Sequence, residues 1–196
     1  MNATIKYYNE NAKQFTEGTA RVDFSEIQDR FLELLPKGAL ILDLGCGAGR
    51  DTKYFLQQGY QAEAMDGSEE LCAVAKQNTG IDVKCMYFQD LDESEKYDGV
   101  WACASLLHLR YEEIVPVLKK VESALKPDGI FYLSFKYGEF EGERNGRYFT
   151  DMTETGMEKL LESIDGFTVL DEWITSDVRP GRENEKWLNL FLRKEK

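Results

Sequence analysis

The stretch ILDLGCGAGRD at residues 41–51 constrains the fold more than any other part of the sequence. An apolar run ends in the carboxylate of Asp43, and three glycines then alternate with small residues before the charged pair at 50–51. Glycine permits positive φ angles and leaves no Cβ between the main chain and a ligand. The stretch therefore predicts a strand, a ligand-binding turn and a helix, in that order.

Apolar spacing along the rest of the chain predicts alternating strands and helices. Strands are expected near residues 39–44, 60–65, 83–88, 100–103, 130–135, 168–173 and 187–192. Helices are expected near residues 5–16, 23–35, 51–58, 69–77, 111–125 and 153–163. Such alternation means parallel strands with crossover helices, whereas the last two strands, joined by a loop, form an antiparallel pair. We predict an α/β fold with a mostly parallel seven-stranded sheet, helices on both faces and a reversed last strand.

Length and composition fit one globular domain, which we expect to span residues 1–196. Apolar runs such as 39–42 and 100–104 are far shorter than a membrane span, so we expect no membrane partner. No signal-peptide pattern is visible in the first 15 residues, which indicates a cytoplasmic protein. Its oligomeric state is open between monomer and homodimer.

Charge and cysteine usage narrow the classes of partner. The formal net charge of −12 disfavours nucleic acid, whose phosphates bind mainly Lys and Arg, and favours a small substrate. The four cysteines, at positions 46, 72, 85 and 103, form no CxxC pair and are read as free thiols. Without a His/Cys cluster at ligand spacing, we expect no metal.

Glycine spacing separates two kinds of ligand. A nicotinamide site needs G-x-G-x-x-G, so that a pyrophosphate can lie on the helix amino terminus. Here the third glycine, Gly49, is one position early and Arg50 stands where the last glycine is needed. The pattern G-x-G-x-G after Asp43 suits a ligand without phosphates and with a cationic amino-acid end.

Five motifs in order resemble those of the class I S-adenosylmethionine-dependent methyltransferases, which have a Rossmann-like fold. They are the glycine turn, AEAMDGS ending near Asp66, FQD at 88–90, YDGVW at 97–101 followed by SLLHL, and LKPDGIFYLSF at 125–135. The YYNENA start also resembles small bacterial tellurite-resistance-like members. One departure is the usually acidic end of the third strand, held here by Tyr87 or Phe88.

This resemblance implies S-adenosylmethionine as cofactor, with S-adenosylhomocysteine as product, and a helical cap at residues 1–36 over the site. Asp66 matches the acid that binds both ribose hydroxyls, and a carboxylate suits two adjacent donors. The implied cofactor-binding residues are Tyr8, Asp43, Gly45, Cys46, Gly47, Arg50, Asp66, Gly67, Ser68, Phe88, Gln89, Asp90, Cys103, Ala104 and His108.

Several of these residues also have a purely structural interpretation. Asp43 could bond backbone at a strand end, and Asp66 precedes a Gly-Ser turn and helix cap. Arg50 could simply begin a helix, although a cation is electrostatically poor there. The only histidine, His108, could pack or begin a helix, and Tyr8 with its neighbour Tyr7 could be core aromatics.

On the acceptor side we expect His108 and Tyr137 as candidate proton acceptors and four cations as substrate-binding residues. These cations are Lys136, Arg147, Arg179 and Arg182, whose charge suits an anionic acceptor. The segment 136–149 is either a solvated loop or a mobile lid. A general base is optional, because the sulfonium is already activated.

The sequence thus favours a methyltransferase acting on a small-molecule acceptor. Two alternatives remain: an RNA or protein methyltransferase, and a cofactor-binding regulatory module without turnover. The first needs a basic face and salt-sensitive binding, and the second needs a closed acceptor pocket. A nicotinamide dehydrogenase is disfavoured by the early third glycine.

Overall fold

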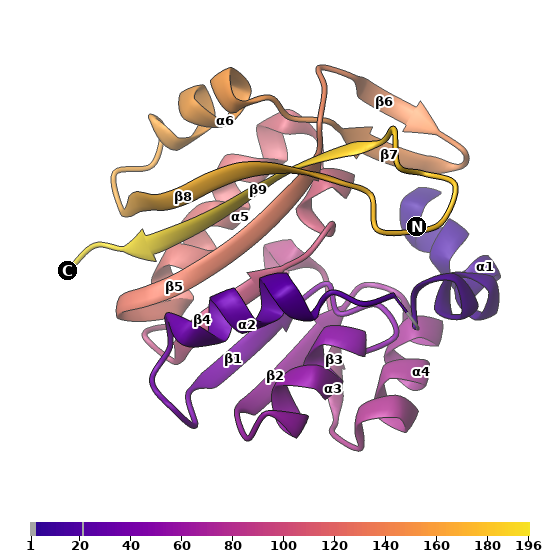
Figure 1. The fold of residues 1–196 in the computed structure, drawn as a ribbon, viewed down its shortest axis with the longest axis horizontal. Coiled ribbons are helices and arrows are strands. Elements are labelled where there is room, and N and C mark those ends of the chain that lie inside the picture. The colour runs from indigo at the N-terminus through magenta and orange to yellow at the C-terminus, as the bar shows by residue number, and fades with distance from the viewer. Residues whose placement is uncertain (1–2, 21) are drawn as a thin grey trace.

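A seven-stranded sheet in the order β3-β2-β1-β4-β5-β9-β8 forms the centre of the molecule (Figure 1). The computed structural model describes residues 3–20 and 22–196. The strands of the sheet are β1 (Leu40–Leu44), β2 (Gln61–Asp66), β3 (Val83–Cys85), β4 (Tyr97–Ala102), β5 (Leu125–Lys136), β8 (Phe167–Ser176) and β9 (Lys186–Lys194). Within the described residues, no helix is long and apolar enough to cross a bilayer.

Strand direction follows the predicted pattern. β1 runs parallel to β2 and β4, and β4 runs parallel to β5. β9 is antiparallel to both neighbours, β5 and β8, so one reversed strand lies inside the sheet. The predicted mostly parallel sheet with a reversed last strand is confirmed. In a sheet of this kind the carboxyl ends of β1, β2, β4 and β5 meet at one edge.

Helices cover both faces of this sheet (Figure 1). Their bounds are α1 (Ala3–Thr19), α2 (Ser25–Glu33), α3 (Arg50–Gln57), α4 (Glu69–Thr79), α5 (Tyr111–Ala124) and α6 (Glu154–Leu161). Two short 3₁₀ turns, η1 (Phe88–Asp90) and η2 (Leu106–His108), follow β3 and β4. Buried side chains of α2, α3 and α4 pack on one face, and those of α5 and α6 pack on the other.

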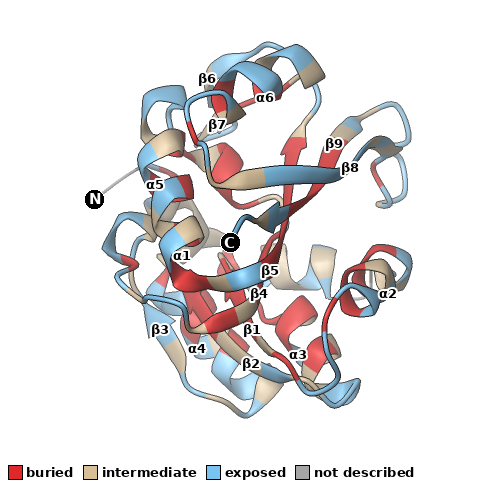
Figure 2. Cartoon of the chain, turned by 90° about the vertical axis from the view of Figure 1, so that its left-hand side faces the viewer, coloured by how far each residue is buried: buried red, intermediate tan, exposed pale blue. Residues whose placement is uncertain are grey.

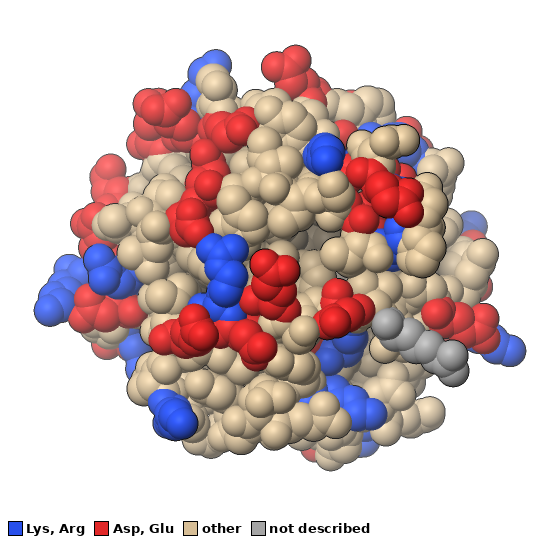
Figure 3. All heavy atoms as spheres, viewed as in Figure 1, with Lys and Arg blue, Asp and Glu red and all other residues tan. Residues whose placement is uncertain are grey.

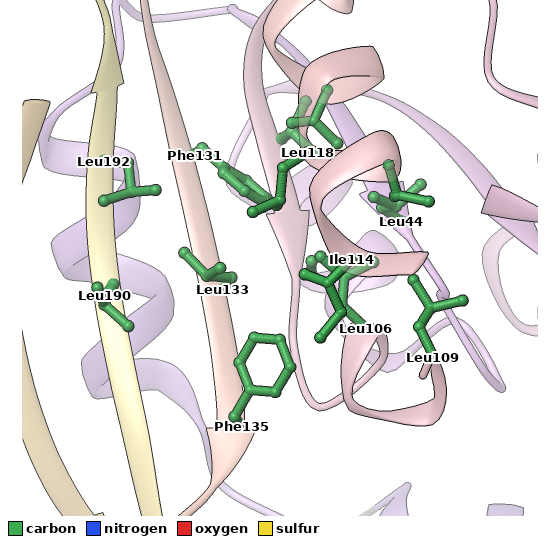
Figure 4. Packing of buried hydrophobic residues seen from close by; sticks show 14 of the residues in the cluster. Leu44, Leu106, Leu109, Ile114, Leu118, Phe131, Leu133, Phe135, Leu190 and Leu192 are labelled. Carbon is green, nitrogen blue, oxygen red and sulfur yellow. The ribbon is translucent and has the colours of Figure 1, made fainter. Parts of the chain in front are cut away.

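The larger core lies between α5 and the sheet (Figure 4). Helical spacing brings Ile114, Leu118 and Val121 to one side of α5, where they are completely buried. Figure 4 shows Leu118 and Ile114 directed toward the side chains of β5, including Phe131 and Leu133. Apolar burial of this kind is the main stabilising contribution to the sheet and its crossover helix.

The opposite face carries an aromatic core beneath α2 and α3. Trp101 of β4 stacks on Tyr132 of β5, with ring centroids 4.0 Å apart. Phe31 of α2 lies 5.1 Å from Trp101 and 5.8 Å from Phe55 of α3, measured between centroids. Figure 2 shows the buried residues concentrated on the strands and on the helix sides that face them. Helix α2 is therefore part of the core.

A hairpin replaces the loop that was expected over residues 136–149. β6 (Glu141–Arg144) pairs antiparallel with β7 (Arg147–Thr150) across a two-residue turn. Asn145 and Gly146 both have positive φ, +49° and +76°, as a type I′ turn requires. The Asn-Gly pair was the overlooked sequence signal for a hairpin. In Figure 1 the hairpin lies beyond the carboxyl end of β5.

Replacing Phe31 by Ala should lower the free energy of unfolding by about 3–5 kcal/mol, because a fully buried ring would leave a cavity among other rings. Urea denaturation followed by tryptophan fluorescence measures this loss. Leu34→Ala is the matched control, since Leu34 is 43% exposed and should cost less than about 1 kcal/mol. Equal losses for both variants would contradict the assignment of α2 to the core.

Candidate functional site

One cavity of about 510 Å³ opens at the carboxyl ends of the parallel strands. Its floor is the β1–α3 turn and the ends of β2, β4 and β5, and its walls include α1, β7 and the β8–β9 loop. This is the position at which open α/β sheets bind ligands. The size lies within the usual range of small-molecule sites.

The glycine turn lies directly against β2 and against its neighbours. The N–H groups of Gly45 and Cys46 both donate to the Met65 carbonyl, at 2.9 and 3.0 Å. Gly45 has a φ of +83°, and a Cβ there would lie 2.5 Å from Cβ of Ser105. Gly47 has a φ of +55°. Both backbone angle and space therefore require glycine at position 45.

Asp66, at the end of β2, holds this turn from the cavity side. The N–H of Gly47 donates to its Oδ2 and the N–H of Ser68 donates to its Oδ1, each at 2.9 Å. Burial raises the pKa of Asp66, although these backbone donors oppose the rise. Each carboxylate oxygen can accept more than one hydrogen bond, so Asp66 retains capacity for a ligand.

Asp43 lies beneath the turn and does not line the cavity. Its Oδ2 accepts hydrogen bonds from the Thr52 N–H at 3.0 Å and from the Thr52 hydroxyl at 2.5 Å. Burial, reinforced by the nearby charge of Asp51, raises the pKa of Asp43 to about 8. Asp43 therefore makes the strand-end backbone contact that was its alternative interpretation. Its hydrogen bonds to Thr52 connect β1 to α3.

Arg50 lines the cavity beside an acid that the sequence analysis left without a role. Its guanidinium donates to both carboxylate oxygens of Asp51, at 2.7 and 2.9 Å, and lies 4.9 Å from the Phe24 ring centroid. The same carboxylate accepts from Gln28 Nε2 and Trp101 Nε1. Asp51 therefore connects α2, α3 and β4 beside the cavity. Its partners in α2 and β4 are distant in sequence, so the sequence did not indicate this role.

Tyr8, His108 and Arg147 meet at the centre of the cavity wall. The Nδ1 of His108 lies 2.7 Å from the Tyr148 carbonyl, so this nitrogen carries the proton. Its Nε2 is then free to accept from the Tyr8 hydroxyl at 2.9 Å, and Arg147 Nη1 donates to Tyr8 at 3.3 Å. Burial lowers the pKa of His108 to about 4, so the imidazole is neutral at physiological pH. Burial raises the pKa of Tyr8.

Most predicted site residues line the cavity. Those that do are Tyr8, Gly45, Cys46, Gly47, Arg50, Asp66, Gly67, Phe88, Cys103, Ala104, His108, Lys136, Arg147, Arg179 and Arg182. Lining residues that the sequence analysis missed include Phe15, Asp51, Ser105, Asp177 and Glu185. Asp51 and Ser105 lie in quoted motifs but were given no role there, whereas Phe15, Asp177 and Glu185 lie in segments that no motif marked.

Five predicted residues lie outside the cavity lining. They are Asp43, Ser68, Gln89, Asp90 and Tyr137. Ser68 caps α4 by accepting from the Leu71 N–H, and its hydroxyl donates to Asn9. The hydroxyl of Tyr137 donates to Glu154 at 2.9 Å, and this tyrosine is 37% exposed. The structure does not bring Tyr137 to the site as a proton acceptor.

The two helices of the predicted cap, residues 1–36, have different positions relative to the cavity. Residues 4, 5, 8, 15 and 19 of α1, with residues 22 and 24 of the following segment, line the cavity. By contrast, α2 packs on the sheet. Coverage of the site by the whole of 1–36 stays a prediction.

The chain is similar to known methyltransferases in sequence. Residues 41–129 match the model of the methyltransferase domain family. The chain is 32% identical over 116 residues to a putative methyltransferase, YqeM, of Bacillus subtilis, with 54% of this chain and 47% of that protein covered. It is 30% identical over 102 residues to a ubiquinone biosynthesis O-methyltransferase of Bradyrhizobium diazoefficiens, with 50% and 40% covered. The chain spans about half the length, or less, of these two curated relatives.

A solved structure matches nearly the whole chain. It is a 1,6-didemethyltoxoflavin-N1-methyltransferase of Burkholderia thailandensis, with a TM-score of 0.76 and 25% identity over 98% of this chain and 85% of that one. The family match lies on the glycine turn and the next three strands, and the TM-score shows that the solved structure shares the overall fold. The chain has the class I methyltransferase fold, and its residues 41–129 match the methyltransferase domain family.

The half-buried, neutral His108 should make the free energy of unfolding fall on acidification. Its folded pKa of about 4 lies below the unfolded value of about 6.5, so the unfolded state takes up a proton first as the pH falls from about 6.5 to about 4. His108→Asn can still donate to the Tyr148 carbonyl but does not titrate. Between pH 7 and pH 5 the wild type should lose about 1–2 kcal/mol more than this variant in urea denaturation. The same loss in both proteins would contradict the assignment.

Proposed function

We propose that this chain transfers a methyl group from S-adenosylmethionine to a small-molecule acceptor. The observation that carries the proposal is the glycine turn with Asp66, which together present backbone donors and a partly used carboxylate to a single cavity. The match to the methyltransferase domain family supports the cofactor, and the names of two similar methyltransferases support a small-molecule acceptor. Single-domain organisation over residues 1–196 is part of the same proposal.

The residues present fit the cofactor on structural grounds. Residues 45 and 47 carry no side chains of their own, and a Cβ at Gly47 would lie 3.1 Å from the Phe15 ring. On this side of the cavity the carboxylates of Asp51 and Asp66 face one cation, Arg50. An excess of negative charge favours a ligand with a cationic sulfonium and ammonium group. In the proposal Asp66 binds the ribose hydroxyls and the turn contacts the amino-acid end.

S-Adenosylmethionine supplies a methyl group on a positively charged sulfur, which needs no further activation. The chain's own task is to position the acceptor and exclude water, which contributes by orientation. His108 is held neutral with its Nε2 accepting from Tyr8, so this pair can take a proton from an acceptor hydroxyl or amine that lies against Tyr8.

Surface charge favours a small acceptor over RNA. The net charge of the chain is −12, and Figure 3 shows acidic and basic side chains interspersed on one face of the molecule. Binding to a phosphate backbone needs clustered cations. The cavity also continues past the glycine turn to Lys136 and Trp187, which leaves room for an acceptor. This space argues against a cofactor-binding module without turnover.

Asp66→Asn should weaken binding of S-adenosylhomocysteine by roughly tenfold or more, because a charge-assisted acceptor becomes a neutral amide. Isothermal titration calorimetry measures the change, and thermal unfolding verifies that the variant is folded. Asp165→Asn, which makes the same chemical change at an exposed position, is the control and should leave the affinity unchanged.

Three results separate the alternatives, when this titration is combined with assays of methyl transfer and of RNA binding. Absence of S-adenosylhomocysteine binding to the wild type would contradict the proposal. Tight binding without methyl transfer to any small molecule, protein or RNA would indicate the regulatory module. RNA binding that weakens steeply with salt, together with RNA methylation, would indicate the macromolecular substrate.

A further inference from the structure

The charges of the cavity are divided between its two ends. Beyond the Tyr8–His108 pair, five cations surround the end formed by β5, the β6–β7 hairpin and the β8–β9 loop. They are Lys136, Arg144, Arg147, Arg179 and Arg182. The carboxylates that pair with them are Asp151, Asp177 and Glu185. Five cations against three carboxylates leave an excess of two positive charges, in a chain whose net charge is −12.

Four of these cations have acidic partners. Arg144 pairs with Asp151, and Arg179 pairs with Asp177, which is buried. Lys136 and Arg182 share the single carboxylate of Glu185, with Arg182 at 3.9 Å. The charges of these side chains are thus largely neutralised within the protein.

Arg147 is different. Among the described residues, no carboxylate lies within ion-pair distance of its guanidinium. It is held instead by aromatic rings, with its Cζ 4.6 Å from the Tyr7 centroid and 5.1 Å from the Phe149 centroid. Cation–π contacts and one hydrogen bond to Tyr8 fix the side chain, but they do not neutralise its charge.

The unused donors of Arg147 lie on one edge of the guanidinium. Its Nε is buried and has no hydrogen-bond partner, the one such side-chain atom within residues 3–20 and 22–196. Only Nη1 donates to another described residue, namely Tyr8, so Nη2 is also unused. The Nε and Nη2 donors together form the side of an arginine that binds a carboxylate with two parallel hydrogen bonds.

On the basis of the proposed function, we propose that the methyl acceptor carries an oxyanion, such as a carboxylate, that binds to the Nε and Nη2 donors of Arg147. This interaction gives the buried Nε of Arg147 a hydrogen-bond partner and neutralises excess positive charge at this end of the cavity. It also places the acceptor beside the Tyr8 hydroxyl, which already contacts Arg147 and His108. Arg147 is thereby the residue that selects anionic acceptors, whereas Arg179 and Arg182 are balanced by Asp177 and Glu185.

Titration of small probes tests this assignment. Benzoate, its uncharged counterpart benzamide, and inorganic sulfate are titrated into the free protein and into the protein saturated with S-adenosylhomocysteine, followed by NMR. The wild type should bind benzoate and sulfate more tightly than benzamide. Arg147→Gln should weaken binding of the two anions by roughly tenfold and leave benzamide unchanged. Arg147→Lys keeps the charge without the two-donor edge, and should recover only part of the affinity.

A matched control and a cofactor measurement complete the experiment. Arg193→Gln removes the same charge at an exposed position of β9, opposite Ile130 of β5, and should leave anion binding unchanged. Equal affinities of wild type and Arg147→Gln for both anions, or no anion binding by the wild type, would overturn the inference. A tenfold loss of S-adenosylhomocysteine affinity in Arg147→Gln would also overturn it, by assigning Arg147 to the cofactor.

Failure of the proposed function gives a different result. If the wild type does not bind S-adenosylhomocysteine, the methyltransferase proposal fails. The titrations of the free protein still report whether Arg147 binds an oxyanion.

Discussion

The contact between the glycine turn and the end of β2 is the constraint on which the site depends. Two successive N–H groups of the turn converge on the Met65 carbonyl, and a third, from Gly47, donates to Asp66. These three bonds fix the turn against the sheet without using a side chain of the turn. Because Gly45 lies against Ser105, any Cβ there would force the turn away from the segment that follows β4. The shape of the cavity floor is therefore a property of the backbone.

Much of the fold follows from patterns that are local in the sequence. Apolar runs bounded by turn residues mark the strands, and helical spacing marks α2 and α5, since both signals arise from burial of one face. The glycine turn and Asp66 are equally local, because they stand at the ends of two strands whose parallel pairing brings them together. These parts could be predicted, and the sheet with its reversed strand was.

The remaining parts of the site depend on pairings between distant segments. Asp51 receives hydrogen bonds from α2 and β4, and Arg147 reaches Tyr8 across 139 positions of the chain. The sequence indicates that cations are present near the acceptor, but not which of them have acidic partners. Neutralisation of Arg179 by Asp177 and the isolation of Arg147 follow from side-chain placement alone. The hairpin is an exception, since Asn145-Gly146 did signal it.

Division of charge along the cavity would allow one protein to bind the two ligands of opposite charge that are proposed above. The acidic end, with Asp51 and Asp66, suits a cationic cofactor, and the basic end around Arg147 suits an anion. In a cavity shielded from bulk water each attraction would be stronger than on the surface, and the two proposed ligands would also attract each other. Binding of the first would then favour binding of the second. Tyr8 and His108, both uncharged and half-buried, lie between the ends and do not neutralise either charge.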